Sequence, residues 1–281
     1  MKSVVRWAVV VLTSLIALII VAYAVVYILS ERILRRTYEV PTIAISLPTD
    51  AESIAEGRRL ATIRGCYGGC HGKEAHGAVM FDEPLIARIV APNLTAAFRR
   101  YSDAQLAVII RRGLRPDGRS VLVMPAEEYM WLTDADLGRI MAFLKSLPPA
   151  DGPGPDIAPG PLGRIGLVTG KFKTVAQLIA DAKAPPEASS EPARFGRYLA
   201  RTTCTSCHGT DLRGASTPDF VAPDLRIAGA YSPEQFMDLI RNGEGLGGRN
   251  LPTMGPWARQ ALSHFKDDEM AALYSYVHGL P

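Results

Sequence analysis

"CTSCHG" at residues 204–209 and "CYGGCHG" at residues 66–72 share one arrangement, two cysteines followed directly by a histidine. Two thiols this close in sequence can bond the two vinyl groups of one haem, and the adjacent histidine can then ligate the iron. The chain has four cysteines, and all of them lie in these two stretches. The pattern therefore predicts covalent haem attachment through Cys204 and Cys207 and through Cys66 and Cys70.

The two stretches differ in spacing. Two residues separate the cysteines at 204–207, as in the usual C-x-x-C-H motif, but three separate Cys66 from Cys70. A haem lost during divergence is one interpretation of the longer motif. Against loss, both cysteines and the following "CHG" remain, and Gly68 and Gly69 allow a longer loop to bulge without strain. We therefore predict two covalently bound haem c groups, one at each stretch.

Each iron needs two axial ligands. His71 and His208 are the predicted proximal ligands, and the second ligand must come from the far side of the haem plane, well downstream in the chain. Met124 and Met254 are predicted for this role, because each follows its histidine at a matching place in a loop beside Pro or Gly. Met130 is the alternative to Met124. Three histidines have no histidine counterpart in the other copy and are expected at the surface: His76, His264 and His278.

The chain around these motifs repeats itself. "YSDAQLAVIIRRG" at 101–113 is answered by "YSPEQFMDLIRNG" at 231–243, and "DADLGRIMAFLKSLP" at 134–148 by "DDEMAALYSYVHGLP" at 267–281. Repetition of this kind indicates two copies of one small domain. Four segments are predicted: an N-terminal transmembrane anchor at 1–31, a first domain at 49–148, a Pro/Gly-rich linker at 149–189 with a short helix near 174–183, and a second domain at 190–281.

The predicted elements are helices. Three residue pairs have the spacing of a capping box, which starts a helix: Thr49 with Glu52, Ser102 with Gln105, and Ser232 with Gln235. Gly113 and Gly243 are expected to end helices. Apolar residues recur at i, i+3, i+4 and i+7 in 134–148 and 267–281, and we assign them to core packing. No segment alternates like a strand, so the predicted fold class is all-α, with short helices and long loops around each covalent haem.

The N-terminus contains an apolar run. Residues 7–30 carry no charge, and as a helix these 24 residues would span about 36 Å, enough to cross a bilayer. A cleaved signal peptide is the alternative, since Lys2 and Arg6 precede the run and Ala22 to Ala24 resemble a cleavage site. The run exceeds the length of a usual signal core, which favours a single-pass anchor. Flanking charges are balanced, so they do not decide orientation.

Other classes of function fit less well. A net charge of +3 gives no reason to expect nucleic acid as a partner. Zinc sites also use paired cysteines, but they space their pairs about 12 to 20 residues apart. Here Cys70 and Cys204 are far more widely separated, so a single four-cysteine zinc site is disfavoured.

The words "CTSCHG", "APNLT", "MPAEEYMWLTDADL" and "MGPWA" carry a resemblance to membrane-anchored dihaem cytochromes c built from two class I cytochrome c domains. The resemblance covers about residues 50–148 and 190–281, and the three-residue spacing in the first motif departs from it. It implies that Pro92 and Pro223 offer their carbonyls to the second ring nitrogen of each ligating histidine. It also implies haem assembly outside the cytoplasm, which places the domains in the periplasm beside the inner membrane.

Two filled axial positions leave no site for a small-molecule substrate, so the expected function is electron transfer rather than catalysis. The expected partners are redox proteins, namely a membrane or periplasmic dehydrogenase, an oxidase or another cytochrome, together with the membrane itself through residues 7–30. Two alternatives stay open. One is a haem enzyme, such as a dihaem peroxidase or thiosulfate-oxidising cytochrome, and the other is a fixed haem subunit of a dehydrogenase or oxidase complex.

Overall fold

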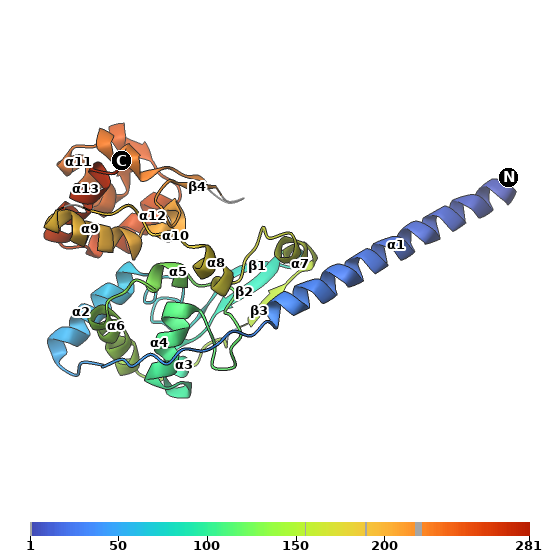
Figure 1. The fold of residues 1–281 in the computed structure, drawn as a ribbon, viewed down its shortest axis with the longest axis horizontal. Coiled ribbons are helices and arrows are strands. Elements are labelled where there is room, and N and C mark those ends of the chain that lie inside the picture. The colour runs from blue at the N-terminus through green and yellow to red at the C-terminus, as the bar shows by residue number, and fades with distance from the viewer. Residues whose placement is uncertain (1, 155, 189, 217–220) are drawn as a thin grey trace.

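A computed structural model describes residues 2–154, 156–188, 190–216 and 221–281 (Figure 1). Residues 1, 155, 189 and 217–220, which fall in the predicted anchor, linker and second domain, lie outside the described residues. The α-helices are α1 (Lys2–Leu34), α2 (Ala51–Ile63), α3 (Leu94–Arg100), α4 (Asp103–Arg112), α5 (Ala126–Tyr129), α6 (Asp134–Ser146), α7 (Pro161–Val168), α8 (Val175–Asp181), α9 (Glu191–Arg201), α10 (Thr205–His208), α11 (Pro233–Asn242), α12 (Met254–Gln260) and α13 (Asp267–His278). The 3₁₀ helices are η1 (Leu225–Ala230), η2 (Leu246–Gly248) and η3 (Leu262–His264), and the strands are β1 (Ala78–Glu83), β2 (Ala87–Ala91), β3 (Asp156–Pro159), β4 (Ala215–Ser216), β5 (Val221–Ala222), β6 (Glu244–Gly245) and β7 (Arg249–Asn250).

Helix α1 extends away from the rest of the molecule (Figure 1). It has 33 residues, and its most apolar part is not buried inside the protein. In the described part of the chain, it is the one helix long and apolar enough to cross a membrane, although a signal sequence has the same properties. The predicted N-terminal apolar helix is therefore confirmed as a candidate span.

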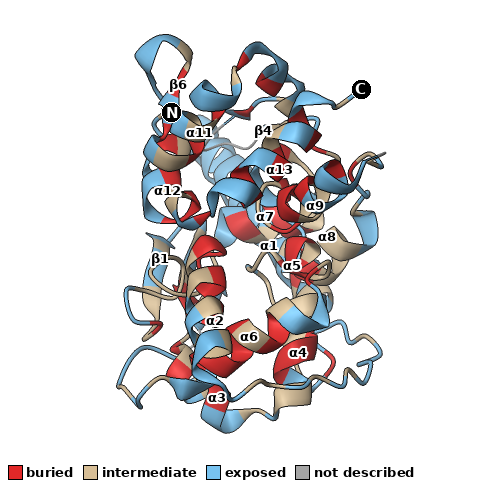
Figure 2. Ribbon diagram, turned by 90° about the vertical axis from the view of Figure 1, so that its left-hand side faces the viewer, coloured by how far each residue is buried: buried red, intermediate tan, exposed pale blue. Residues whose placement is uncertain are grey.

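Each domain is built on a pair of crossing helices, α2 with α6 in the first domain and α9 with α13 in the second. A glycine lies at each crossing. A Cβ atom on Gly57 would lie 2.0 Å from the carbonyl oxygen of Arg139, and a Cβ on Gly196 would lie 1.9 Å from that of Ala272. No side chain fits in either place, so the glycine of the repeated "GRRLA" and "GRYLA" stretches allows the two helices of each pair to cross closely. Buried residues line both pairs (Figure 2).

The hydrophobic core is divided in the same way. One cluster of buried apolar residues forms the core of the first domain and includes Leu60, Phe98, Leu137, Met141 and Leu144. The other forms the core of the second domain and includes Leu199, Phe236, Met270, Leu273 and Val277. The apolar positions that recur every three or four residues in 134–148 and 267–281 contribute to these clusters, which confirms their assignment to core packing.

Most helix ends follow the predicted signals. Capping boxes form at Ser102 and Ser232, and Gly113 and Gly243 end helices α4 and α11 with left-handed φ values of 60° and 71°. The prediction at Thr49 was wrong by one residue. Asp50 caps α2 instead, because its carboxylate accepts a hydrogen bond from the backbone nitrogen of Ser53 at 2.8 Å.

The structure also contains short strands, which the sequence pattern did not predict. Strands β1, β2 and β3 form an antiparallel sheet in that order, and two further pairs are each two residues long. The strand signal was weak for a physical reason. Strand β1 is mostly exposed on both faces and carries a bulge between Val79 and Phe81, so its apolar residues do not alternate.

The segment between α1 and α2 is fixed to the first domain. The backbone nitrogen of Tyr38 donates to the carbonyl oxygen of Gly118 at 2.9 Å. Ile43, Ile45 and Leu47 pack against the first core cluster, and Gly138 lacks a Cβ that would lie 2.5 Å from the carbonyl oxygen of Ser46. The first domain is therefore held to this segment rather than attached by a loose tether.

The predicted linker is more structured than its composition indicates. The helix expected near 174–183 is confirmed as α8, but α7 and β3 were not predicted. Helix α7 was not predicted because its sequence contains two glycines, which normally weaken helices. Both are required here, because a Cβ on Gly163 would lie 2.1 Å from the carbonyl oxygen of Ile86, and a Cβ on Gly166 would lie 2.2 Å from the ring of Phe172. The bounds of the four predicted segments remain our proposal.

Candidate haem-binding sites

The two predicted proximal histidines have the same hydrogen bond. Nδ1 of His71 lies 2.9 Å from the carbonyl oxygen of Pro92, and Nδ1 of His208 lies 2.9 Å from that of Pro223. A carbonyl oxygen can only accept, so Nδ1 carries the proton in both rings and the lone pair of Nε2 is left for a metal. Burial lowers the pKa of both histidines, which favours the neutral form that a metal binds.

The backbone after each histidine follows one pattern. The carbonyl oxygen of His71 accepts from the nitrogen of Gly77 at 2.8 Å, and that of His208 accepts from the nitrogen of Gly214 at 2.8 Å. Gly77 and Gly214 both have a φ of 91°. Between them and the histidines lies a non-glycine residue in the left-handed region, Ala75 in one copy and Leu212 in the other. In both copies a glycine follows the "HG" pair at the same spacing. This pattern indicates the turn, and it was not among the motifs used to predict the sites.

The longer first motif is accommodated by glycines. His71 lies ten positions after Ala61, whereas His208 lies eight positions after the corresponding Ala200. The first attachment loop is therefore longer than the second by two residues. Gly65 and Gly68 have φ values of 70° and 80°, and a side chain on Gly68 would meet open space. A Cβ on Gly69 would lie 2.8 Å from the Cα atom of Gly65. The added residues therefore turn through glycines, and the hydrogen bonds after the histidine are unchanged.

The four cysteines are free thiols, three of them partly buried and Cys207 exposed. Burial raises the pKa of Cys66 to about 12 and raises the pKa of the other three thiols as well. In the described residues, no three His, Cys, Asp or Glu side chains are grouped to hold a metal ion. Unbridged thiols beside a neutral imidazole are the donor set that covalent haem requires, so these residues fit that cofactor.

The predicted methionines each pack against the core cluster of their own domain, but Met254 lies at the start of a helix rather than in the predicted loop. Met124 lies in the loop before α5, is half-buried and packs against the first core cluster, and Met254 begins α12 and packs against the second. Met130 ends α5 and is not part of the first cluster. Axial ligation by Met124 and Met254 stays a prediction. His264 and His278 are exposed, as expected, and His76 is half-buried.

Each attachment loop contacts the other domain across the interface between the domains. A Cβ on Gly65 would lie 2.8 Å from the ring of Trp257, and the side-chain nitrogen of Gln260 donates to the carbonyl oxygen of Gly68. Both partners lie in α12, the helix that begins with Met254. From the first domain, α5 contacts α10, which carries the second motif. No local pattern in the sequence indicates these contacts.

A buried carboxyl group lies in this interface. Glu128 on α5 is 3 % exposed, and its Oε1 has no hydrogen-bond partner within the described parts of the chain. Burial raises the pKa of Glu128 to about 8, with a hydrogen bond from Ser206 of the second motif acting in the opposite direction. Burial therefore favours the neutral form of this carboxyl group.

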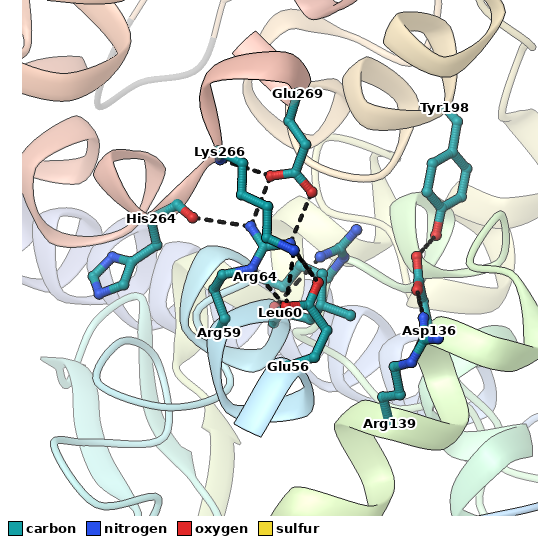
Figure 3. Close-up of polar contacts among 10 residues, drawn as sticks. All are labelled: Glu56, Arg59, Leu60, Arg64, Asp136, Arg139, Tyr198, His264, Lys266 and Glu269. Carbon is teal, nitrogen blue, oxygen red and sulfur yellow. Dashed lines mark hydrogen bonds and ion pairs between the residues drawn. The ribbon is translucent and has the colours of Figure 1, made fainter. Parts of the chain in front are cut away.

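An ion-pair cluster also joins the domains (Figure 3). Arg59 on α2 contacts Glu56 at 2.6 Å and Glu269 on α13 at 2.7 Å, and it also donates to the carbonyl oxygen of His264 at 2.9 Å. Lys266 reaches Glu56 at 3.3 Å. We call Glu56, Arg59, Lys266 and Glu269 the interdomain cluster. Beside it, the hydroxyl of Tyr198 on α9 donates to Asp136 on α6 at 2.5 Å, as can be followed in Figure 3.

Two helical domains, each with a histidine held by a proline carbonyl beside a pair of thiols, define a tandem cytochrome of the c type. The family model described as Cytochrome c matches residues 54–148 and 193–281. The chain belongs to the cytochrome c family. The predicted fold class and family are therefore confirmed, and domains of this family imply covalently bound haem c.

The chain is also similar to curated proteins. It is 24% identical over 270 residues to the fructose dehydrogenase cytochrome subunit of Gluconobacter japonicus, covering 86% of this chain and 55% of that protein. It is 25% identical over 258 residues to the cytochrome c subunits of the quinone alcohol dehydrogenases of Gluconacetobacter polyoxogenes and Komagataeibacter europaeus, covering 79% of this chain and 54% of each relative. The chain thus spans about half the length of these relatives. They are named as cytochrome subunits, which confirms the prediction of an electron-transfer component rather than a catalytic subunit.

Proposed function

We propose that this chain is a membrane-anchored dihaem cytochrome c that receives single electrons from a dehydrogenase and passes them to a membrane or periplasmic acceptor. The observation that carries the proposal is the pair of matched histidine–proline geometries, each at 2.9 Å, in two family domains whose attachment loops each contact the other domain. The names of the relatives favour a dehydrogenase as the electron donor. They also favour a fixed subunit over a freely diffusing carrier.

Covalently bound haem c would supply an iron that alternates between the ferrous and ferric states. The protein residues would hold the haem groups and set their redox properties. Cys66 with Cys70, and Cys204 with Cys207, would hold the two groups in place.

The axial residues would set the redox properties. His71 and His208 present neutral imidazoles whose Nδ1 protons are engaged by Pro92 and Pro223, which fixes the ring orientation. Met124 and Met254 would fill the remaining positions, and this combination raises the reduction potential relative to two histidines.

The domain interface supports transfer between the two sites. Trp257 and Gln260 from the second domain lie against the first attachment loop. The interdomain cluster holds this arrangement, so the distance between the two sites is set by packed protein rather than by a mobile linker. A constant separation between redox centres is what a two-centre relay needs.

The proposed location is the inner membrane, with α1 as a single-pass anchor and the haem domains in the periplasm. The length of the uncharged run supports the anchor. The periplasmic side is favoured because covalent haem c is attached outside the cytoplasm.

Solubilising native membranes gently and isolating the chain through a C-terminal tag tests the proposal. We expect a flavoprotein or quinoprotein dehydrogenase to co-purify, and we expect its substrate to reduce the haems of the isolated complex. A variant carrying His208→Ala and His71→Ala is the control, since it should be inactive in this reduction. Isolation of the haem-loaded chain alone, reduced only by a small soluble cytochrome, would contradict the assignment as a dehydrogenase subunit.

A further inference from the structure

An exposed apolar surface lies at the base of α1. Its residues come from the turn between β1 and β2, from α7 and from the loop that follows α7: Leu85, Ile86, Leu162, Ile165 and Phe172. Each is between 37% and 64% exposed. We call these five residues the α7 surface. It lies outside the haem sites, and its α7 and Phe172 parts lie outside the segments matched by the cytochrome c family.

The parts of the α7 surface are fixed to one another. The backbone nitrogen of Leu162 donates to the carbonyl oxygen of Leu85 at 2.8 Å, and that of Gly160 donates to the carbonyl oxygen of Ile86 at 2.9 Å. The nitrogen of Phe172 donates to the carbonyl oxygen of Gly166 at 3.0 Å. The apolar side chains are therefore presented by a rigid platform rather than by separate mobile loops.

The platform is attached to α1 at the level where its apolar run ends. The guanidinium of Arg164 on α7 lies 4.0 Å from the ring centre of Tyr27 and donates to Ser30 at 2.8 Å. It also pairs with Glu31 at 2.9 Å, the first charged residue after the run. In Figure 1, α1 runs in the plane of the picture while α7 is seen nearly end-on, so α7 lies across α1. A helix placed in this way lies parallel to a membrane that α1 crosses.

The charges around the α7 surface fit a lipid headgroup layer. Lys171 beside Phe172 and Arg32 on α1 are exposed, and Lys173, which also flanks Phe172, pairs with Asp181 at 2.7 Å. Apolar and aromatic side chains bordered by basic residues are typical of segments that lie in the membrane interface, where the bases meet anionic headgroups. A protein partner would not require the surface to lie at this level of α1.

We propose that the α7 surface docks on the bilayer that α1 crosses, with Leu162, Ile165 and Phe172 in the headgroup and upper acyl region. This inference rests on the proposed membrane anchor. Docking holds the first domain at a fixed height and orientation above the membrane, because α7 is bonded to α1 and to the β1–β2 turn. The attachment loops then face any membrane-bound redox partner in a constant direction.

Thiol accessibility in the full chain tests the proposal. Ile165→Cys and Leu162→Cys place a thiol in the α7 surface, and Ile227→Cys is the matched control, because Ile227 is 44% exposed in the second domain. Each haem-loaded variant is reconstituted in nanodiscs of phosphatidylcholine and phosphatidylglycerol, and its reaction with a charged maleimide is followed by mass spectrometry. We expect both α7 thiols to react about tenfold or more slowly than the control. Two sites guard against a single variant that fails to load haem.

Extraction of membranes with alkaline carbonate is measured in parallel. Release of the chain would refute the anchor, and with it the docking. A chain that resists extraction but whose α7 thiols react as fast as the control would overturn the docking alone. The docking would also be overturned if the α7 thiols react fast in nanodiscs but are protected in native membranes. In that case a protein partner, not lipid, covers the α7 surface.

Discussion

Arg59 in the interdomain cluster provides a sharp test of how the two domains are held. We consider Arg59→Gln, which removes the charge that faces Glu56 and Glu269. The side chain of Glu269 is 8% exposed and that of Arg59 is 16% exposed, so the remaining carboxylates would be poorly compensated by water. Removing one member of a buried pair costs about 3 to 5 kcal/mol, and partial exposure here places the expected loss of stability at about 2 to 3 kcal/mol.

Urea unfolding of the haem-loaded chain, followed by the Soret band, measures this loss. Lys266→Gln is the matched control, because the Lys266 side chain is 54% exposed and its contact with Glu56 is longer, at 3.3 Å. An exposed pair of this kind is worth about 0.5 kcal/mol. Equal effects of the two substitutions would refute the view that Arg59 is the central cation of the interface.

The same cluster predicts a pH dependence. Hydrogen bonds from Arg59, opposed by burial, lower the pKa of Glu56 to about 2 from its usual 4.5. A carboxylate whose pKa is lower in the folded state stabilises the fold above pH 4.5 and loses that contribution as pH falls towards 2. The difference in stability between the wild type and Arg59→Gln should therefore shrink over this range. A difference that does not change with pH would contradict the ion-pair explanation.

Two further predictions concern the helix crossing and the axial ligand. Gly196→Ala should destabilise the second domain by about 2 to 3 kcal/mol in thermal unfolding, because its Cβ would lie 1.9 Å from the carbonyl oxygen of Ala272, whereas Gly229→Ala, with open space around it, should change stability by less than about 0.5 kcal/mol. Met124→Ala should lower the reduction potential of the first haem and convert it to a high-spin form in the absorption spectrum, while Met130→Ala should leave both unchanged. If Met130→Ala rather than Met124→Ala changes the potential and the spectrum, Met130 is the axial ligand. If neither substitution changes them, the haem-enzyme alternative is supported.

The repeat explains why much of the fold could be predicted. Caps, apolar periodicity and the attachment motifs are local signals, and each occurs twice, so one copy supports the other. Ser102 and Ser232 cap their helices as expected, and the histidines meet proline carbonyls that the family resemblance implied. The strands and α7 were missed because β1 is exposed on both faces, and because the glycines of α7 are kept for close packing rather than for helix stability.

The interface between the domains could not be predicted from local patterns. Arg59 and Glu269 lie 210 positions apart, and Gln260 and Gly68 lie 192 apart. Such contacts depend on how two complete domains dock, and neither periodicity nor spacing indicates that. Trp257 illustrates this limit. In the sequence it is a residue of the "MGPWA" word beside a predicted ligand, whereas in the structure its ring also lies against Gly65 of the other attachment loop.

The number of covalently bound haems tests the central claim most directly. Intact mass of the purified chain, combined with the reduced pyridine-haem spectrum, gives that number without reference to any partner. Two haems per chain are expected, falling to one in a Cys66→Ala, Cys70→Ala variant and to one in a Cys204→Ala, Cys207→Ala variant. One haem in the wild type, unchanged when Cys66 and Cys70 are replaced, would contradict the assignment of the first motif as a working attachment site.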